Sequence, residues 1–165
     1  MSDLNELSHI DPATKAKVLL EALPYVQKFR DSLFVVKYGG SFLDENNLEM
    51  QRRVAMDIVF LSSVGIRVAL VHGGGKAITR ALSQSGIETR FVNGLRYTDE
   101  ATIKVVEQTL NGEVNEQICK TIKDAGGIPA PTHGQRVFAC EKLAFDHSGD
   151  PVELGFVGSI TSISP

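Results

Sequence analysis

Two glycine turns, each placed directly after a short apolar run, are the features of this sequence that could do chemistry. The first turn, residues 39–40, follows the run at 33–37, and the second turn, residues 73–75, follows the run at 66–71. A turn between a strand and a helix offers backbone N–H groups, and glycine lets a ligand approach the main chain closely. The pair of turns predicts an anion site; the alternative is that the glycines only permit tight turns. Neither turn has the spacing of a Walker loop or of a G-x-G-x-x-G fingerprint.

Two basic residues stand where an anion would need them. Lys37 ends the first apolar run, so its ammonium would emerge beside the glycine amides, unless it only reaches from a strand end into water. Arg96 precedes a long helical pattern, and its guanidinium can hold a carboxylate through two parallel hydrogen bonds. The alternative for Arg96 is a surface ion pair. His72, beside the second turn, is interpreted as a hydrogen-bond partner of that turn rather than as a general base.

No metal site and no disulfide framework are predicted. Asp146, His147 and Asp150 share a turn but lack the spacing of metal ligands. Cys119 and Cys140 form no C-x-x-C pair, and the chain starts without a basic leader or an apolar signal region. These features favour a reducing, cytoplasmic location.

The apolar runs at 33–37 and 66–71 are predicted to be strands buried on both faces. The stretch between them has helical spacing and ends near Gly65, which gives strand, helix, strand. Such a unit pairs its strands in parallel, so both glycine turns should lie at one edge of the sheet. A short helix is predicted over 77–85, closed by Gly86.

Longer helical patterns lie on either side of this unit. Residues 11–30 predict an amphipathic helix capped by Asp11, and Pro24 removes one of its backbone hydrogen bonds, so two helical pieces are expected. A longer helix should begin at Thr98, its predicted cap, and end at Gly126. The later segments RVFACEKL and ELGFVGSITSI predict a hairpin and a further strand.

Composition limits the class of protein. The chain has 165 residues, of which 42% are hydrophobic and 22% charged, as expected for one soluble globular unit. Its net charge of -3 and its scattered basic residues argue against a role in nucleic-acid binding. No apolar run reaches the roughly 20 residues that a membrane span needs.

Five motifs follow one another between residues 34 and 165: FVVKYGGS, VALVHGGGKAITRALSQSGI, FVNGLRYTDE, LNGEVNEQI and LGFVGSITSISP. On these motifs the chain, over residues 11–165, resembles the amino-terminal half of the N-acetyl-L-glutamate kinases, within the amino acid kinase superfamily. The first two motifs point only to the superfamily, and the third, followed by the long helix, is more specific. The resemblance implies an α/β fold, a three-layer αβα sandwich with an open, mainly parallel central sheet.

The resemblance also implies an activity and the residues that carry it. The family transfers the γ-phosphoryl group of ATP, accompanied by Mg²⁺, to the side-chain carboxylate of N-acetyl-L-glutamate in arginine biosynthesis. Lys37 is implied as the catalytic residue that touches the phosphates, and Arg96 as the ligand of the substrate's main carboxylate. The implied donors of backbone amides are Gly39, Gly40, Gly73 and Gly74. A carboxylate with a pKa of about 4 is already ionised at neutral pH and needs no general base.

Two departures from the family pattern matter. Lys76 stands where the family usually has proline after the glycine triplet, which adds a positive charge beside the turn. The asparagine, aspartate and second lysine of the family's distal half have no matching positions. The chain is therefore expected to be a fragment without the nucleotide lobe and to have little kinase activity alone.

The chain is divided into two predicted parts. Residues 1–31 resemble the helical extension of hexameric, arginine-inhibited members, so a homo-oligomer, dimer or hexamer, is expected; the alternative is a helix packed on its own core. Residues 32–165 are the predicted acetylglutamate-binding lobe. Two other functions stay open: another superfamily enzyme, of the glutamate 5-kinase or carbamate kinase type, or a non-catalytic acid-binding or oligomerisation module.

Overall fold

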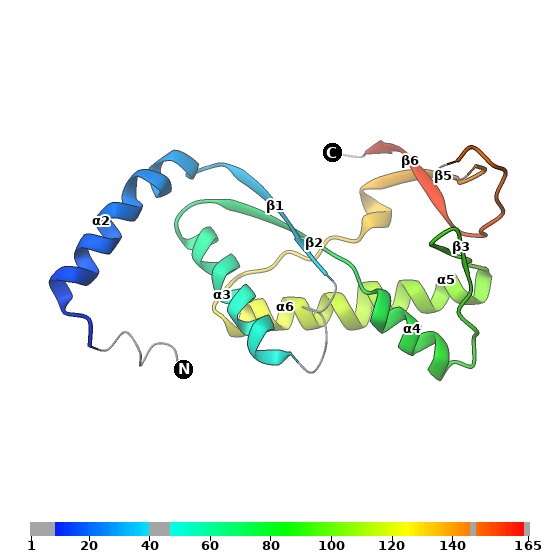
Figure 1. Cartoon of the computed structure of the whole chain (residues 1–165), viewed down its shortest axis with the longest axis horizontal. Coiled ribbons are helices and arrows are strands. Elements are labelled where there is room, and N and C mark those ends of the chain that lie inside the picture. Colours follow the sequence, from blue (N-terminus) through cyan, green and yellow to red (C-terminus); the bar gives the residue numbers. More distant parts are fainter. Residues whose placement is uncertain (1–8, 40–46, 146–147, 164–165) are drawn as a thin grey trace.

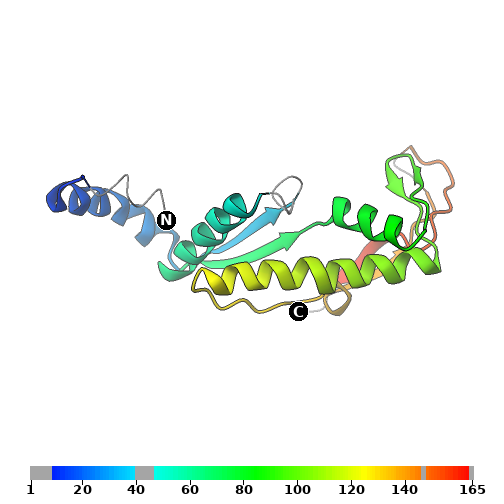
Figure 2. The same ribbon diagram turned by 90° about the horizontal axis from the view of Figure 1, so that it is seen from below.

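A strand, a helix and a second strand form the centre of the fold, as predicted (Figure 1). The strands are β1, Leu33–Tyr38, and β2, Arg67–His72, and the helix between them is α3, Leu48–Ser63. The strands pair in parallel, and Figure 2 shows both arrows pointing the same way. The computed structural model describes residues 9–39, 47–145 and 148–163. The predicted α/β class is confirmed, with one two-stranded parallel sheet in this part of the chain.

The helices cover one face of this sheet. Tyr38 is buried against Val114 and Ile118 of the long helix, whereas Val35 on the opposite face of the strand is 70% exposed. The prediction that both faces are buried is therefore wrong for the described residues. An uninterrupted apolar run indicates an apolar strand, but it does not reveal which layers of the protein cover it.

A long helical rod runs beneath the sheet in the view of Figure 1. It consists of α5, Glu100–Glu107, a π-helical segment η2, Gln108–Val114, and α6, Asn115–Asp124. Gly126 follows with φ +92°, a left-handed conformation that suits glycine and ends the helix. The long helix is confirmed, while its π-helical segment was not expected from the sequence.

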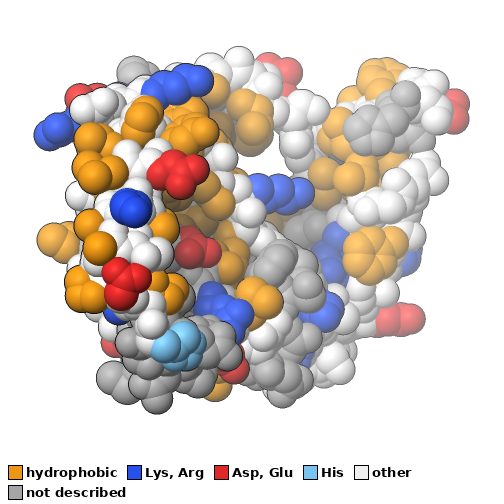
Figure 3. Space-filling model, turned by 60° about the vertical axis from the view of Figure 1, so that its left-hand side comes forward, with side chains coloured by type: hydrophobic (Ala, Val, Ile, Leu, Met, Phe, Trp, Pro, Cys, Tyr) orange, Lys and Arg blue, Asp and Glu red, His pale blue; other side chains and the backbone are white. Residues whose placement is uncertain are grey.

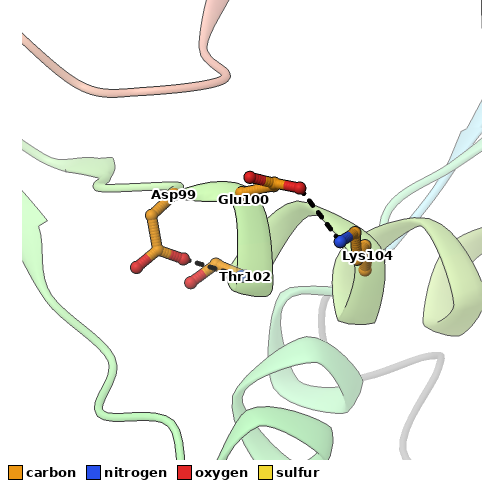
Figure 4. Close-up of polar contacts among 4 residues, drawn as sticks. All are labelled: Asp99, Glu100, Thr102 and Lys104. Atoms are coloured by element: carbon orange, nitrogen blue, oxygen red, sulfur yellow. Dashed lines mark hydrogen bonds and ion pairs between the residues drawn. The ribbon is translucent and has the colours of Figure 1, made fainter.

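The cap of this rod is Asp99 rather than the predicted Thr98. The Asp99 carboxylate accepts a hydrogen bond from the backbone N–H of Thr102 at 2.8 Å (Figure 4). Thr98 is unavailable because its hydroxyl donates to the carbonyl of Arg96, and its backbone N–H donates to Leu154. Both residue types can cap a helix, so the tertiary contact decides between neighbours.

The helix α2, Pro12–Phe29, is one continuous helix with Pro24 inside it, so the expected division into two pieces is wrong. Asp11 caps it as predicted, accepting from the N–H groups of Ala13 at 2.9 Å and Thr14 at 3.1 Å. Proline removes a single N–H donor, and the helix bonds on either side remain. The helix has no buried residue, so the carbonyl left without a partner can face water.

The remaining elements surround the end of the long helix. The helix α4, Gly75–Gln84, matches the predicted short helix and starts two residues earlier. Two-residue strands β3, Phe91–Val92, and β4, Leu95–Arg96, form a small hairpin that was not predicted. A short 3-10 turn, η3, Gly134–Arg136, leads into the predicted antiparallel pair. That pair is β5, Phe138–Lys142, with β6, Gly158–Ile163.

None of the helices in the described ranges is both long enough and apolar enough to cross a membrane.

The cap at Asp99 gives a prediction about pH. Hydrogen bonds from the backbone N–H and the hydroxyl of Thr102 hold the pKa of Asp99 below its ordinary value. A lowered folded-state pKa stabilises the protein above the unfolded pKa, and the benefit is lost as the pH falls through the folded pKa. Asp99→Ala should therefore lower the midpoint of thermal unfolding at about pH 7, and its difference from the wild type should shrink towards about pH 3.

Scanning calorimetry at the two pH values measures this difference. Asp99→Asn serves as the matched control, because an amide oxygen still accepts the bond from Thr102 but does not titrate. We expect Asp99→Asn to fall between the wild type and Asp99→Ala at about pH 7. An Asp99→Ala difference of the same size at both pH values would contradict the assigned cap.

Candidate functional site

The two glycine turns meet at the carboxyl edge of the parallel strands. The backbone N–H of Gly73 donates to the carbonyl of Tyr38 at 3.1 Å, which extends the β1–β2 pairing by one step. A Cβ added to Gly39 would lie 4.0 Å from the backbone nitrogen of Gly73. Both turns therefore lie at one edge of the sheet, as the strand–helix–strand pattern predicts. Gly40 lies outside the described residues.

The supply of backbone donors at this edge differs between the glycines. The N–H of Gly73 is already engaged by Tyr38, whereas no described residue accepts a hydrogen bond from the N–H of Gly39 or Gly74. Gly74 is also the residue before the first turn of α4, where unpaired N–H groups and the helix dipole favour a negative charge. The edge thus presents donors from two separate segments of the chain.

Gly74 has a second requirement, which is close packing. A Cβ at this position would lie 2.6 Å from Cδ2 of Leu110 and 3.4 Å from Cγ2 of Val114. Both side chains belong to η2, so the second turn lies directly on the π-helical segment of the long helix. The absence of a side chain at residue 74 lets the turn and the helix approach each other.

Lys37 lies one residue before this edge and on the open face of the sheet. It pairs in register with Val71, and the alternation of the strand places it on the same side as Val35, away from the buried ring of Tyr38. Its side chain is exposed, and within the described ranges no hydrogen bond or ion pair engages it. The ammonium can therefore reach an anion held at the edge.

Figure 3 shows the molecule hollowed between the end that carries α2 and the end that carries the β3–β4 and β5–β6 pairs. Lys and Arg side chains are visible inside the hollow. The apolar side chains of α2 are spread over the near surface in the same view.

Arg96 is held by neutral groups. Its Nη1 donates to the hydroxyl of Thr89 at 3.2 Å and its Nη2 donates to the hydroxyl of Thr79 at 3.0 Å. The guanidinium carbon lies 4.8 Å from the ring centre of Phe91, and burial lowers the pKa of Arg96. No carboxylate of the described residues contacts Arg96. The alternative prediction for Arg96, a surface ion pair, is therefore not observed among these residues.

Thr79 connects Arg96 to the second turn. Its hydroxyl donates to the carbonyl of Gly75 at 2.9 Å while its oxygen accepts from Arg96. A guanidinium carries five N–H donors, and the two threonines use two of them. The arrangement fixes the plane of the guanidinium and leaves donors for a carboxylate.

His72 has the role expected from its position. Its Nδ1 lies 3.1 Å from the carbonyl oxygen of Gly73, and its Nε2 lies 3.2 Å from Nδ2 of Asn115. Both ring nitrogens are therefore engaged by the turn and by the long helix. The histidine stabilises the turn, as interpreted from the sequence.

A separate cavity of about 400 Å³ lies between α3, β2, α4 and the long helix. Its lining is mainly apolar and includes Tyr38, Ile58 and Ile118. The one arginine among its lining residues, Arg80, forms an ion pair with Glu113. This cavity therefore suits an acidic ligand less well than the edge of the sheet does.

The remaining candidates from the sequence either lie outside the described residues or directly follow the second turn. Asp146 and His147 are among the residues that the structure does not describe, and the residues that it does describe hold no group of three His, Cys, Asp or Glu that could bind a metal. Lys76 is exposed in the first turn of α4.

Sequence reasoning missed the residues that support the site: Thr79, Thr89 and Asn115. Thr79 had a local signal, since a threonine four residues after Gly75 on a helix can return its hydroxyl to that carbonyl. The roles of Thr89 and Asn115 depend on contacts across 7 and 43 residues, so no local pattern reveals them.

Comparison with known proteins shows which protein family this chain belongs to. Residues 32–164 match the sequence model of the amino acid kinase family. The acetylglutamate kinase of a Synechococcus species is 44% identical over 158 residues, which cover 96% of this chain and 49% of that protein. The acetylglutamate kinase of Akkermansia muciniphila is 40% identical over 147 residues, with 88% and 49% coverage. The resemblance read from the motifs is confirmed, and the chain spans about half the length of these relatives.

A solved structure supports the fold. The N-acetylglutamate synthase of Neisseria gonorrhoeae, in complex with coenzyme A and N-acetyl-glutamate, matches with a TM-score of 0.67 over 88% of this chain and 32% of that chain. Its sequence identity is 24%, so the likeness concerns the fold alone.

Proposed function

Because the chain belongs to the amino acid kinase family, we propose that it forms the acid-binding part of an acetylglutamate kinase. The reaction transfers the γ-phosphoryl group of ATP to the side-chain carboxylate of N-acetyl-L-glutamate and gives an acyl phosphate, a step of arginine biosynthesis in the cytoplasm. The names of the relatives support this choice. The observation that carries it is the meeting of two glycine turns at one sheet edge beside Lys37.

The chemistry needs charge neutralisation more than proton transfer. A carboxylate oxygen attacks the γ-phosphorus, the bond to the β-phosphate oxygen breaks, and ADP leaves with that electron pair. The attacking carboxylate is already ionised at neutral pH, so the barrier contains the repulsion between two anions. The N–H groups of Gly39 and Gly74 and the ammonium of Lys37 relieve this repulsion, while Gly73 lets the main chain approach the ligand.

Arg96 binds the main carboxylate of the acid in this proposal. Its support is the set of neutral partners, the hydroxyls of Thr79 and Thr89, which orient the guanidinium without satisfying its charge. A planar guanidinium with a fixed orientation suits bidentate recognition of a carboxylate. The acid would then lie between Arg96 and the edge of the sheet.

The described residues fit the phosphoryl group better than they fit a metal. Amide N–H groups and a lysine suit phosphate oxygens, and this part of the chain contains no cluster of three metal-binding side chains. ATP supplies the phosphoryl group and brings Mg²⁺ with it in this proposal. Phosphoryl oxygens of the bound nucleotide would face Lys37 and the glycine amides.

Calorimetric titration tests the proposed ligand. We expect the purified chain to bind N-acetyl-L-glutamate in preference to L-glutamate and carbamate. Preference for L-glutamate or carbamate would favour another enzyme of the superfamily. Binding of none of the three would contradict an acid site in this chain.

Arg96→Lys tests the carboxylate ligand. The lysine keeps the positive charge but loses the fork of donors, so affinity for N-acetyl-L-glutamate should fall about tenfold or more. Arg90→Lys is the matched control, because Arg90 belongs to the same segment and stacks on Tyr97 at 4.5 Å. Equal affinities of Arg96→Lys and Arg90→Lys would contradict the role of Arg96.

We also propose that residues 1–31 are an oligomerisation extension of the lobe at 32–165, giving a homodimer or a hexamer. The supporting observation is that α2 has no buried residue, although its apolar side chains are large. The exposed apolar side chains of this helix are Val18, Leu19, Leu20, Leu23 and Tyr25. A helix of this kind gains stability when a second surface covers it.

Removal of residues 1–30 should lower the oligomeric state, because it removes the whole of α2. Light scattering coupled to size-exclusion chromatography measures the mass. Removal of residues 1–9 alone is the control and should leave the mass per assembly nearly unchanged, since α2 begins at Pro12. An unchanged number of subunits after removal of residues 1–30 would rule out this role.

A further inference from the structure

A chain of hydrogen bonds runs from the long helix to the second glycine turn. The thiol of Cys119 lies 3.6 Å from Oδ1 of Asn115, and Nδ2 of Asn115 lies 3.2 Å from Nε2 of His72. Nδ1 of His72 lies 3.1 Å from the carbonyl oxygen of Gly73. The N–H of Gly73 then donates to Tyr38 in the neighbouring strand at 3.1 Å.

The acceptor at one end of this chain fixes the position of every proton in it. The carbonyl of Gly73 can only accept, so Nδ1 of His72 carries the proton. A neutral imidazole has one N–H, so Nε2 is an acceptor and Asn115 must present its NH₂ group. The amide oxygen of Asn115 then faces Cys119, whose thiol donates. All four groups are satisfied in a single arrangement of the protons.

The position of Asn115 follows from the shape of the long helix. It is the first residue of α6 and comes directly after the π-helical segment η2. A π-helical segment contains more residues per turn than an α-helix, so it changes the direction of the side chains that follow it. The same segment contributes Leu110 and Val114, which lie against Gly74. The long helix therefore lies against Gly74 of the second turn and bonds to His72, the residue before that turn.

We propose that Asn115 is a positioning residue for the anion site: it selects the Nδ1–H tautomer of His72, and this tautomer holds the carbonyl of Gly73. The inference rests on the proposed function of the glycine turns. With the carbonyl of Gly73 held by His72 and its N–H held by Tyr38, the peptide units on both sides of Gly73 are fixed. The N–H of Gly74 belongs to the same peptide unit as the carbonyl of Gly73, so it then points to a constant place at the edge.

Loss of the Asn115 amide leaves Nε2 of His72 without a donor. The imidazole can then carry its proton on either nitrogen, and the Nε2–H form cannot donate to Gly73. The turn keeps its packing on Leu110 and Val114 but loses the bond that orients the Gly73 carbonyl. A purely structural role for Asn115 would change stability without changing the tautomer of His72.

The first measurement uses the wild-type chain. Long-range ¹H–¹⁵N spectra of the histidine rings report the protonated nitrogen, and His72→Gln assigns the His72 signals. We expect the Nδ1–H form for the neutral ring. Observation of the Nε2–H form would overturn the proposal without any need for a variant at residue 115.

The second measurement compares Asn115→Leu with Asn111→Leu. Asn111 lies on the same helix, and its amide donates to Gln135 at 3.2 Å in an exposed contact that involves neither His72 nor Gly73. Asn115→Leu should give a mixture of His72 tautomers, speed hydrogen exchange of the Gly73 amide about tenfold, and weaken binding of N-acetyl-L-glutamate about tenfold. Asn111→Leu should change none of these quantities.

A third variant keeps the test decisive if Asn115→Leu fails to fold. Asn115→Asp has nearly the same shape, but its ionised carboxylate can only accept, so a proton should appear on Nε2 of His72. An unchanged His72 tautomer and an unchanged Gly73 exchange rate in a folded variant would overturn the proposal. If the wild type binds no acid, the proposed function fails, while the tautomer and the exchange rate still decide the role of Asn115.

Discussion

The parallel pairing of β1 and β2 is the constraint on which the rest of the site depends. The register that joins Tyr38 to His72 makes the strands end together, and the bond from Gly73 to Tyr38 extends that pairing into the turns. Side chains then alternate between the two faces of each strand. Tyr38 and His72 face the helices, while Lys37 faces the open side. A slip of one residue would reverse these directions, so one register sets both the donors and the charge at the edge.

The long helix is the second support of the same edge. Its π-helical segment lies against Gly74, and Asn115 reaches His72 beside the turn. Arg96 is positioned independently, by hydroxyl groups of α4 and of the segment before β3. The site therefore combines backbone donors with few formal charges. An anion bound there would be recognised by geometry more than by net charge, which agrees with a chain whose net charge is -3.

Much of the fold could be predicted because its signals are local. Apolar runs ended by glycine gave both strands and the shared edge of their turns, and the stripe of apolar residues gave the long helix. The errors arose where a tertiary contact or the surroundings decided the outcome. Thr98 lost the capping position to Asp99 because Thr98 bonds to Arg96 and Leu154. The exposed face of β1 depended on what covers the sheet, which no strand pattern reveals.

Two further differences between the sequence-based predictions and the structure concern Pro24 and the β3–β4 hairpin. Pro24 costs its helix one hydrogen bond, and in an exposed helix this did not divide it. The β3–β4 hairpin could have been predicted from Asn93 and Gly94, which both adopt positive φ angles in its turn. For the candidate site, residue types and order predicted Lys37, Arg96 and the glycines as candidates. The supports of these residues, Thr79, Thr89 and Asn115, required the coordinates.

The most direct test of the anion site is a titration followed by the backbone amide signals of the chain. Addition of N-acetyl-L-glutamate should shift the amides of Gly39 and Gly74 and the guanidinium signal of Arg96 together, along one saturating curve. Saturable shifts confined to other regions, such as the residues that line the apolar cavity or the β5–β6 hairpin, would contradict an acid held between the two turns and Arg96.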